Sequence, residues 1–183
     1  KLVKKPGWGG YILALVVWDL LIIDIDNDPS DTEDPLVYIK SNIEKFYPNE
    51  LFYINKTARG YHIYLVSKLL SHASKAAIYM RIKLCSDPAH ATNSLYTGSS
   101  VRLNSKIGNT GLPSQYLTKC GAGQEDPEAL RLYNVIQNYI AKYGSYVTDE
   151  IESNQTLLRE LYNIWMSTQE QHNDFGLVHI RAT

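Results

Sequence analysis

The sequence predicts a mixed fold of strands and helices, α+β or α/β, that ends in a helical appendage. Short apolar runs rich in β-branched residues alternate with helical patterns over residues 11–120. Two long helical patterns follow in residues 127–169, after a Gly-rich and polar stretch at residues 121–126. Because mixed elements come first and helices come afterwards, we predict a core of residues 1–122 and an appendage of residues 123–183.

The core is predicted to begin with two strands and a helix. Residues 11–17 and 19–26 are short apolar runs and are expected to be strands. Residues 35–47 carry apolar side chains at helical spacing, with lysines and a glutamate on the other face. Two further strands are expected at residues 51–55 and 61–67, joined by a basic turn.

The rest of the chain is predicted from similar patterns. A helix, an irregular stretch and two strands are expected, in that order, at residues 71–83, 85–94, 100–104 and 116–120. Asp126 before Pro127 is a good N-cap for a helix over residues 127–143. A second helix is predicted for residues 149–169, and residues 175–180 are expected to form a short strand or a docking segment.

Length and composition are those of an ordinary globular protein. The chain has 183 residues, 44% hydrophobic and 20% charged, which suits one domain, or one domain with a small appendage, and a core of normal size. The formal net charge of −1 gives no global basic signature, although a local basic groove can lie opposite an acidic site. The 14 tyrosines are expected to pack at the rim of the core more often than to stack on bases.

Two cysteines and the absence of long apolar runs indicate an intracellular protein. Cys85 and Cys120 make no disulfide framework and are expected to be free thiols in a reducing compartment. No run approaches the roughly 20 apolar residues that span a bilayer, so no membrane partner is expected. The Lys-rich start lacks a cleavage-site pattern, so we expect no signal peptide. Since the first residue is Lys, the chain is consistent with a trimmed or partial copy of a longer polypeptide.

The first candidate site is acidic. An apolar run of four residues leads into Asp24, and Asp26 follows two residues later, so the two side chains share one face of a strand. Two carboxylates this close repel each other unless a cation lies between them, and hard divalent ions prefer such oxygen ligands. From this stretch alone, the alternative that Asp26 simply begins a polar turn stays open.

Two further segments carry complementary chemistry. Lys56 and Arg59 lie in the turn before the strand of His62. Arg102 lies on a later strand, and Lys106 follows it. Such side chains bind phosphate oxygens and neutralise pyrophosphate charge, while divalent ions held by carboxylates stabilise the attacking and leaving oxygens of nucleotidyl transfer. The segments together therefore indicate nucleotidyl transfer.

With these motifs in order, the chain resembles the catalytic core of the archaeo-eukaryotic primase superfamily, and more narrowly the primase-polymerases of viruses and plasmids. The first motif of that family is an apolar strand ending in Asp-x-Asp or Asp-x-Glu, which residues 24–26 match as Asp-Ile-Asp. The second is a small residue, any residue and a histidine, which residues 60–62 match as Gly-Tyr-His. The resemblance covers about residues 20–106.

The third motif of the family matches in its second half. It joins an apolar residue and an acid to a downstream Arg-Leu strand and a lysine, and Arg102, Leu103 and Lys106 fit that second half. Asp87 is the only carboxylate between Glu50 and Arg102, so it is the candidate for the third acid. It follows a serine and not a large apolar residue, which departs from the family pattern.

The resemblance implies an α+β fold with the mixed, largely antiparallel sheet of the RRM-like primase core, flanked by helices and followed by the small C-terminal helical appendage. It implies that Asp24, Asp26 and Asp87 bind two Mg²⁺ or Mn²⁺ ions and, with His62, are the catalytic residues. The nucleotide and its phosphates would be contacted by Lys56, Arg59, His62, Arg102 and Lys106.

The function implied is that of a DNA primase-polymerase, which joins nucleoside triphosphates on a single-stranded DNA template to make or extend primers in replication. Such a protein would act in the cytoplasm or at the nucleoid, or in the host cell of a virus. The sequence has no Walker-type phosphate loop, so a replicative helicase would be another part of the same polypeptide or another chain.

Three alternative functions and one structural metal site also have candidate residues in the sequence. A catalytically silent primase-fold module would bind nucleotide or single-stranded nucleic acid. An Asp-x-Asp phosphatase would use the first acid as nucleophile, but Asn27 replaces the expected glycine and no late acidic pair follows. A Rep-type endonuclease needs His-hydrophobe-His, and Tyr64 ends that triplet here. Structural zinc is not expected, because its candidate ligands are scattered: Cys85, His90, Cys120 and His72.

Overall fold

The computed structural model describes residues 14–27, 34–105, 111–145, 156, 159 and 175–177. In these residues the chain is α+β, with helices packed against two antiparallel sheets, so the predicted mixture of helices with largely antiparallel strands is confirmed. The strands are β1 (Ala14–Val17), β2 (Ile22–Asp26), β3 (Phe52–Thr57), β4 (Gly60–Leu65), β5 (Ser99–Arg102), β6 (Ser114–Cys120) and β7 (Phe175–Leu177). The helices are α1 (Pro35–Phe46), α2 (Lys75–Lys83), α3 (Pro88–Thr97) and α4 (Pro127–Tyr143).

The central sheet has the strand order β2-β4-β3-β6, and each neighbouring pair is antiparallel. Its register places Ile23 beside Ile63 and Ile63 beside Ile54, so these side chains share one face. That face is buried in a core with Ile39 of α1 and Met80 of α2. The alternate residues therefore project from the opposite face.

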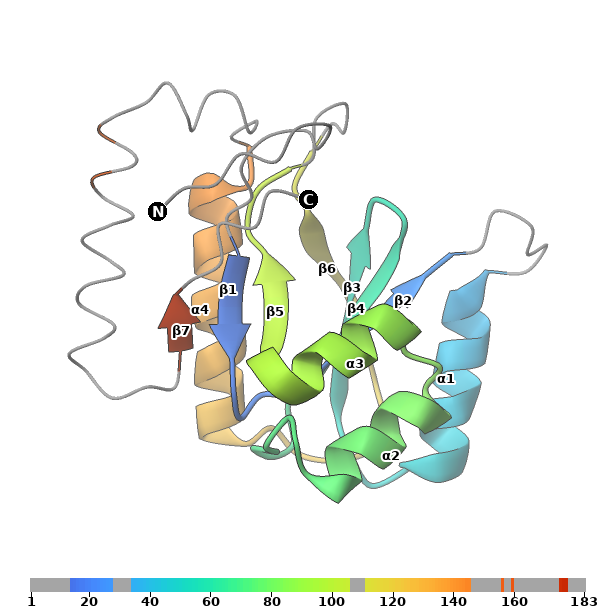
Figure 1. Cartoon of the computed structure of the whole chain (residues 1–183). Helices are drawn as coiled ribbons and strands as arrows, with labels where there is room; N and C mark the ends of the chain where they lie inside the picture. The colour runs from blue at the N-terminus through green and yellow to red at the C-terminus, as the bar shows by residue number, and fades with distance from the viewer. Residues whose placement is uncertain are drawn as a thin grey trace.

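A second sheet has the order β5-β1-β7 and lies with α4 over the opposite face of the central sheet (Figure 1). The shared core includes Leu15 of β1, Val101 of β5 and Tyr64 of β4. Tyr133 and Ile136 of α4 are buried in the same core. The first helix of the predicted appendage is therefore packed against the strands that precede it.

The other predicted segments of the appendage are described only in part. Thr156 and Arg159 are helical, and the remainder of the helix predicted at residues 149–169 lies outside the described residues. β7 falls within the segment predicted at residues 175–180 and pairs with β1, with Val16 opposite Gly176. A segment near the end of the chain thus extends a sheet whose central strand, β1, lies near its start.

The main difference from the predicted elements is α3, which occupies part of the stretch expected to be irregular. Asp87 is its N-cap and accepts a hydrogen bond from the backbone N–H of His90, while Pro88 opens the first turn. Short helices of this kind depend on capping and packing more than on a long apolar pattern. Across the helices that the structure describes, none has the length and apolar character to cross a membrane.

Candidate functional site

The polar half of one face of the central sheet forms the candidate site. Asp24 of β2 lies directly opposite His62 of β4, and Asn55 of β3 lies on the other side of His62. The Nε2 atom of His62 is 3.5 Å from Oδ1 of Asp24. Asp26 lies two residues further along β2, on the same face and at its exposed end. We call this surface the site face.

Gly60 allows β2 and β4 to come together at the open end of the site face. It pairs with Asp26, and a Cβ atom at this position would lie 1.9 Å from the carbonyl oxygen of Ile25. Any side chain would therefore push the two strands apart. This steric requirement explains the small residue of the Gly-Tyr-His motif, independently of any resemblance to a protein family.

His62 is held neutral by its surroundings. Burial is the main cause that lowers its pKa, to about 4, and the positive charges of His90 and Arg102 lower it further, while Asp26 opposes them. A neutral imidazole offers one N–H donor and one acceptor. Its Nδ1 atom is buried and makes no hydrogen bond to the described residues. His62 can therefore donate through Nε2, on the edge that faces Asp24.

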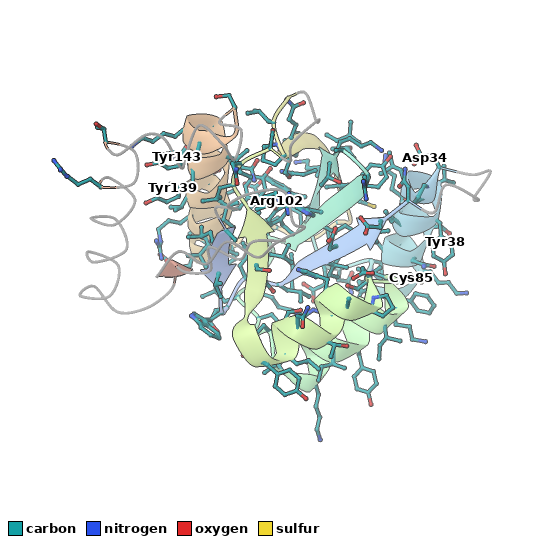
Figure 2. All side chains as sticks on the ribbon, turned by 45° about the horizontal axis from the view of Figure 1, so that its top comes forward. Asp34, Tyr38, Cys85, Arg102, Tyr139 and Tyr143 are labelled. Carbon is teal, nitrogen blue, oxygen red and sulfur yellow. The ribbon has the colours of Figure 1, made fainter. Side chains whose placement is uncertain are left out.

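Arg102 brings a positive charge to the site from the second sheet. It is the last residue of β5, is half-buried, and lies in the middle of the molecule at the end of that strand (Figure 2). Burial lowers its pKa to about 10, so it stays charged at neutral pH. Its charge acts on His62, which indicates that the two residues share one electrostatic environment.

The backbone of Asp87, and not its side chain, contacts the site face. Its N–H donates to the carbonyl oxygen of Asp24 (2.7 Å), and this bond fastens the start of α3 to β2. Its side chain accepts from the backbone N–H of His90 (2.7 Å) and so caps the helix. Within the described residues, no three histidine, cysteine or acidic side chains converge as a metal-binding group.

The carboxylates nevertheless suit a hard divalent ion. Asp24 and Asp26 offer oxygen ligands from one face of a strand, which is the chemistry that Mg²⁺ and Mn²⁺ prefer. Mg²⁺ is commonly bound by only one or two carboxylates, with water and substrate phosphates completing its shell. Two carboxylates are therefore sufficient for an ion that arrives with a triphosphate.

The remaining basic residues do not join this group in the described structure. Lys56 pairs with Tyr61, which places both on the opposite face of the sheet, and its Nζ lies 4.0 Å from the centre of the Tyr61 ring. Arg59 is exposed in the turn between β3 and β4, where its carbonyl oxygen accepts from Asn27. Lys106 lies outside the described residues.

Beside His62, a buried polar network was not anticipated from the sequence. Asn55 donates to the Oγ atom of Ser114 (3.1 Å) and to the Oε1 atom of Gln137 (3.0 Å). It accepts from the hydroxyl of Tyr133 (2.9 Å). This network links β3, the strand that pairs with the strand of His62, to α4. The only signal in the sequence is an asparagine at the end of an otherwise apolar run.

The two cysteines lie apart from the site face. Cys85 is exposed and its Sγ atom is 3.4 Å from the hydroxyl of Tyr38 on α1 (Figure 2). Cys120 is buried, and burial is the main cause that raises the pKa of its thiol. Both are free thiols.

Comparison with known proteins adds no relative to this description. No protein-family model, no curated protein and no solved structure matches the chain. The site is therefore interpreted from its own geometry, together with the motifs in its sequence.

Proposed function

We propose that the chain is the catalytic domain of a DNA primase-polymerase, a nucleotidyltransferase that makes or extends primers on a single-stranded DNA template. The observation that carries the proposal is the pairing of Asp24 with His62 across β2 and β4, with Asp26 on the same face. Two motifs that are far apart in the sequence thus contribute to one surface. Arg102 adds a permanent positive charge from a third motif.

Each of these side chains has a role in the proposed reaction. Asp24 and Asp26 would hold the divalent ions, Mg²⁺ or Mn²⁺, which supply charge stabilisation to the attacking and leaving oxygens. His62, neutral at pH 7, donates a hydrogen bond from Nε2 to a phosphate oxygen of the incoming nucleotide. Arg102 neutralises the charge that develops on the departing pyrophosphate.

The wider context belongs to the same proposal. The substrates are nucleoside triphosphates, the template is single-stranded DNA, and the reaction takes place inside a cell, in the cytoplasm or at the nucleoid. A replicative helicase on the same polypeptide or on another chain would supply the template strand.

A second candidate function is a primase-fold module that binds nucleotide or single-stranded nucleic acid without catalysis. The observation in its favour is that the side chain of Asp87 caps α3, and that no group of three side chains able to hold a metal ion is found among the described residues. A site of two carboxylates can bind a metal–triphosphate complex and still lack the full ligand set for two ions.

The test is synthesis or extension of primers on a single-stranded template with Mn²⁺ or Mg²⁺. We expect activity in the wild type and a loss of at least about a hundredfold in the Asp24→Asn, Asp26→Asn double variant, because the metal ligands are gone. Glu128→Gln, at an exposed position on α4, is the matched control and should retain activity.

Other outcomes separate the alternatives. Triphosphate binding without any polymer would support the silent module. Hydrolysis of phosphomonoesters, with no polymer made, would contradict the proposal in favour of the phosphatase alternative.

A further inference from the structure

One edge of the imidazole of His62 is not fixed by a hydrogen bond within the described part of the chain. Its Nδ1 atom is buried and finds no partner among those residues. In many sites a histidine that binds a ligand through one ring nitrogen is oriented by a carbonyl or carboxylate oxygen at the other. Because the Nδ1 edge lacks such a partner here, the orientation of the ring depends on the side chains packed around it.

The ring of Tyr64 packs against this imidazole. Tyr64 follows His62 by two residues on β4, so both side chains project from the same face of the sheet. The two ring centroids are 6.3 Å apart, and the rings meet edge to face at 78°. Tyr64 is fully buried, whereas the side chain of His62 is 15% exposed. A completely enclosed ring therefore lies beside the one that reaches the surface.

Tyr133 of α4 contacts the ring of Tyr64 in turn. Their centroids are 5.0 Å apart, and their planes cross at 77°. The hydroxyl of Tyr133 donates to Oδ1 of Asn55 (2.9 Å), the residue of β3 that lies directly opposite His62. Tyr133 also packs edge to face against Tyr53, at 5.0 Å. Close packing on all these contacts leaves the ring of Tyr133 little freedom to change rotamer.

We propose that Tyr64 is a positioning residue for His62, and that Tyr133 makes α4 part of the site by holding Tyr64 in place. The inference rests on the proposed function for the role of His62, whose Nε2 atom donates to a phosphate oxygen of the nucleotide. Rotation of the imidazole would move Nε2 away from the edge that faces Asp24. The edge-to-face contact opposes this rotation, so the donor is oriented before the nucleotide binds and less ordering is needed on binding.

The test is a double-mutant cycle between Tyr64 and His62, measured as the affinity for a non-hydrolysable nucleoside triphosphate in the presence of Mn²⁺. Tyr64→Met fills the space with a flexible chain in place of a flat ring. It should weaken binding about fivefold when His62 is present and have no effect in the His62→Ala background. A merely structural role would weaken binding in both backgrounds. Tyr64→Phe keeps the ring and should restore the affinity.

Nuclear magnetic resonance of the free protein provides a measurement that needs no nucleotide. The ring protons of His62 should give one narrow set of signals in the wild type at neutral pH. Tyr64→Met should broaden or double these signals, because the imidazole then adopts more than one orientation. Tyr133→Met should cause the same change in a weaker form, and it provides the test if Tyr64→Met does not fold.

Two variants of α4 separate positioning from stability. Tyr139 lies further along the helix and stacks on Tyr143, with centroids 6.0 Å apart (Figure 2). Tyr139→Met should lower the thermal stability and leave the signals of His62 and the affinity unchanged. Tyr133→Phe removes the donor to Asn55 but keeps the ring, so it should lower stability and bind the nucleotide like the wild type.

The outcomes distinguish this inference from the proposed function. Wild-type affinity in Tyr64→Met, an equal loss of affinity in both backgrounds, or a single narrow set of His62 signals in Tyr64→Met would overturn the positioning role and leave the proposed function intact. A wild type that does not bind the nucleotide would overturn both. Coupling between Tyr64 and His62 without polymer synthesis would support the positioning role and overturn catalysis alone.

Discussion

At the scale of single residues, the site depends on one histidine kept neutral next to two carboxylates. His62 lies 3.5 Å from Asp24, yet burial lowers its pKa to about 4. The reason is that the free-energy cost of desolvating a charged imidazole exceeds the stabilisation that neighbouring groups provide. In the proposed reaction, a neutral His62 would donate to phosphate without adding a charge that would compete with the metal. The requirement for glycine at position 60 is equally local, since only a residue without a Cβ atom fits against the backbone of Ile25.

Because His62 is held neutral, we predict that the free energy of unfolding in metal-free buffer depends on pH. Its pKa is lower in the folded protein than the ordinary value of 6.5, so protons bind the unfolded chain more strongly. The contribution is present above pH 6.5 and is lost as the pH falls towards 4, by up to about 3 kcal/mol. Denaturant unfolding of wild type and His62→Gln at several pH values measures it.

The comparison between these two proteins isolates the histidine. We expect the free energy of unfolding to fall more steeply in wild type than in His62→Gln between pH 6.5 and 4. Above pH 7 the two curves should run parallel. Equal slopes across the whole range would show that His62 is not held neutral in the fold.

At the scale of elements, α3 connects the two sheets. Its N-terminus is fastened to β2 through Asp87, and the chain then turns at Gly98 into β5, which carries Arg102. The left-handed backbone of Gly98 (φ 79°) suits glycine at this turn. Movement of this helix would therefore shift Arg102 relative to Asp24.

The N-cap of α3 allows the two possible roles of Asp87 to be separated. Asp87→Asn keeps a good capping side chain but removes the charge, whereas Asp87→Ala loses the cap and should cost about 1 kcal/mol of stability. If Asp87 is the third metal ligand, the asparagine variant should lose primer synthesis and keep its stability. Chemical denaturation and the primer assay measure the two effects.

A second N-cap provides the control for this experiment. Asp126 caps α4 by accepting from the N–H groups of Glu128 and Ala129. Asp126→Ala should cost a similar amount of stability, and Asp126→Asn should change neither stability nor activity. Full activity of Asp87→Asn would remove Asp87 from the metal site and leave it as a structural cap.

At the scale of the whole molecule, the site lies where two separately packed layers meet. The apolar face of the central sheet is buried against α1 and α2, and the other face is covered by α4 and the second sheet over its apolar half only. The polar half is left for Asp24, Asp26 and His62. Tyr133 of α4 joins the cover to the site through its hydrogen bond with Asn55.

The two-carboxylate site predicts that metal and nucleotide bind cooperatively. Asp24 and Asp26 alone leave most of the coordination shell to water, and triphosphate oxygens would replace part of it. We expect the affinity for Mn²⁺ to rise at least about tenfold when a non-hydrolysable nucleoside triphosphate is present, and the reverse effect to be equal. Electron paramagnetic resonance of free Mn²⁺ measures this coupling.

The matched variant is the Asp24→Asn, Asp26→Asn double substitution. It should lose the coupling while keeping weak, metal-independent binding of the triphosphate through His62 and Arg102. Tight binding of Mn²⁺ to the wild type without nucleotide would contradict the prediction, because it would require further protein ligands.

The sequence alone determined the local features of this protein. Alternation along β2 put Asp24 and Asp26 on one face, and the Asp126-Pro127 pair set the start of α4 where the structure has it. It also predicted the class of the fold, because strand and helix patterns depend on neighbouring residues. The resemblance to primases added an expected function, and the experiments above test it.

Only the tertiary structure decided which distant residues meet. The register of β2 on β4 set Asp24 beside His62, and the alternation of β3 turned Lys56 to the other face. The hydrogen bond from the N–H of Asp87 to the carbonyl oxygen of Asp24 placed the start of α3 beside β2. Packing also placed buried side chains of α4 in the same core as those of β1, β4 and β5. The physical reason is that register, capping and burial depend on contacts between segments far apart in the chain, which a local pattern does not contain.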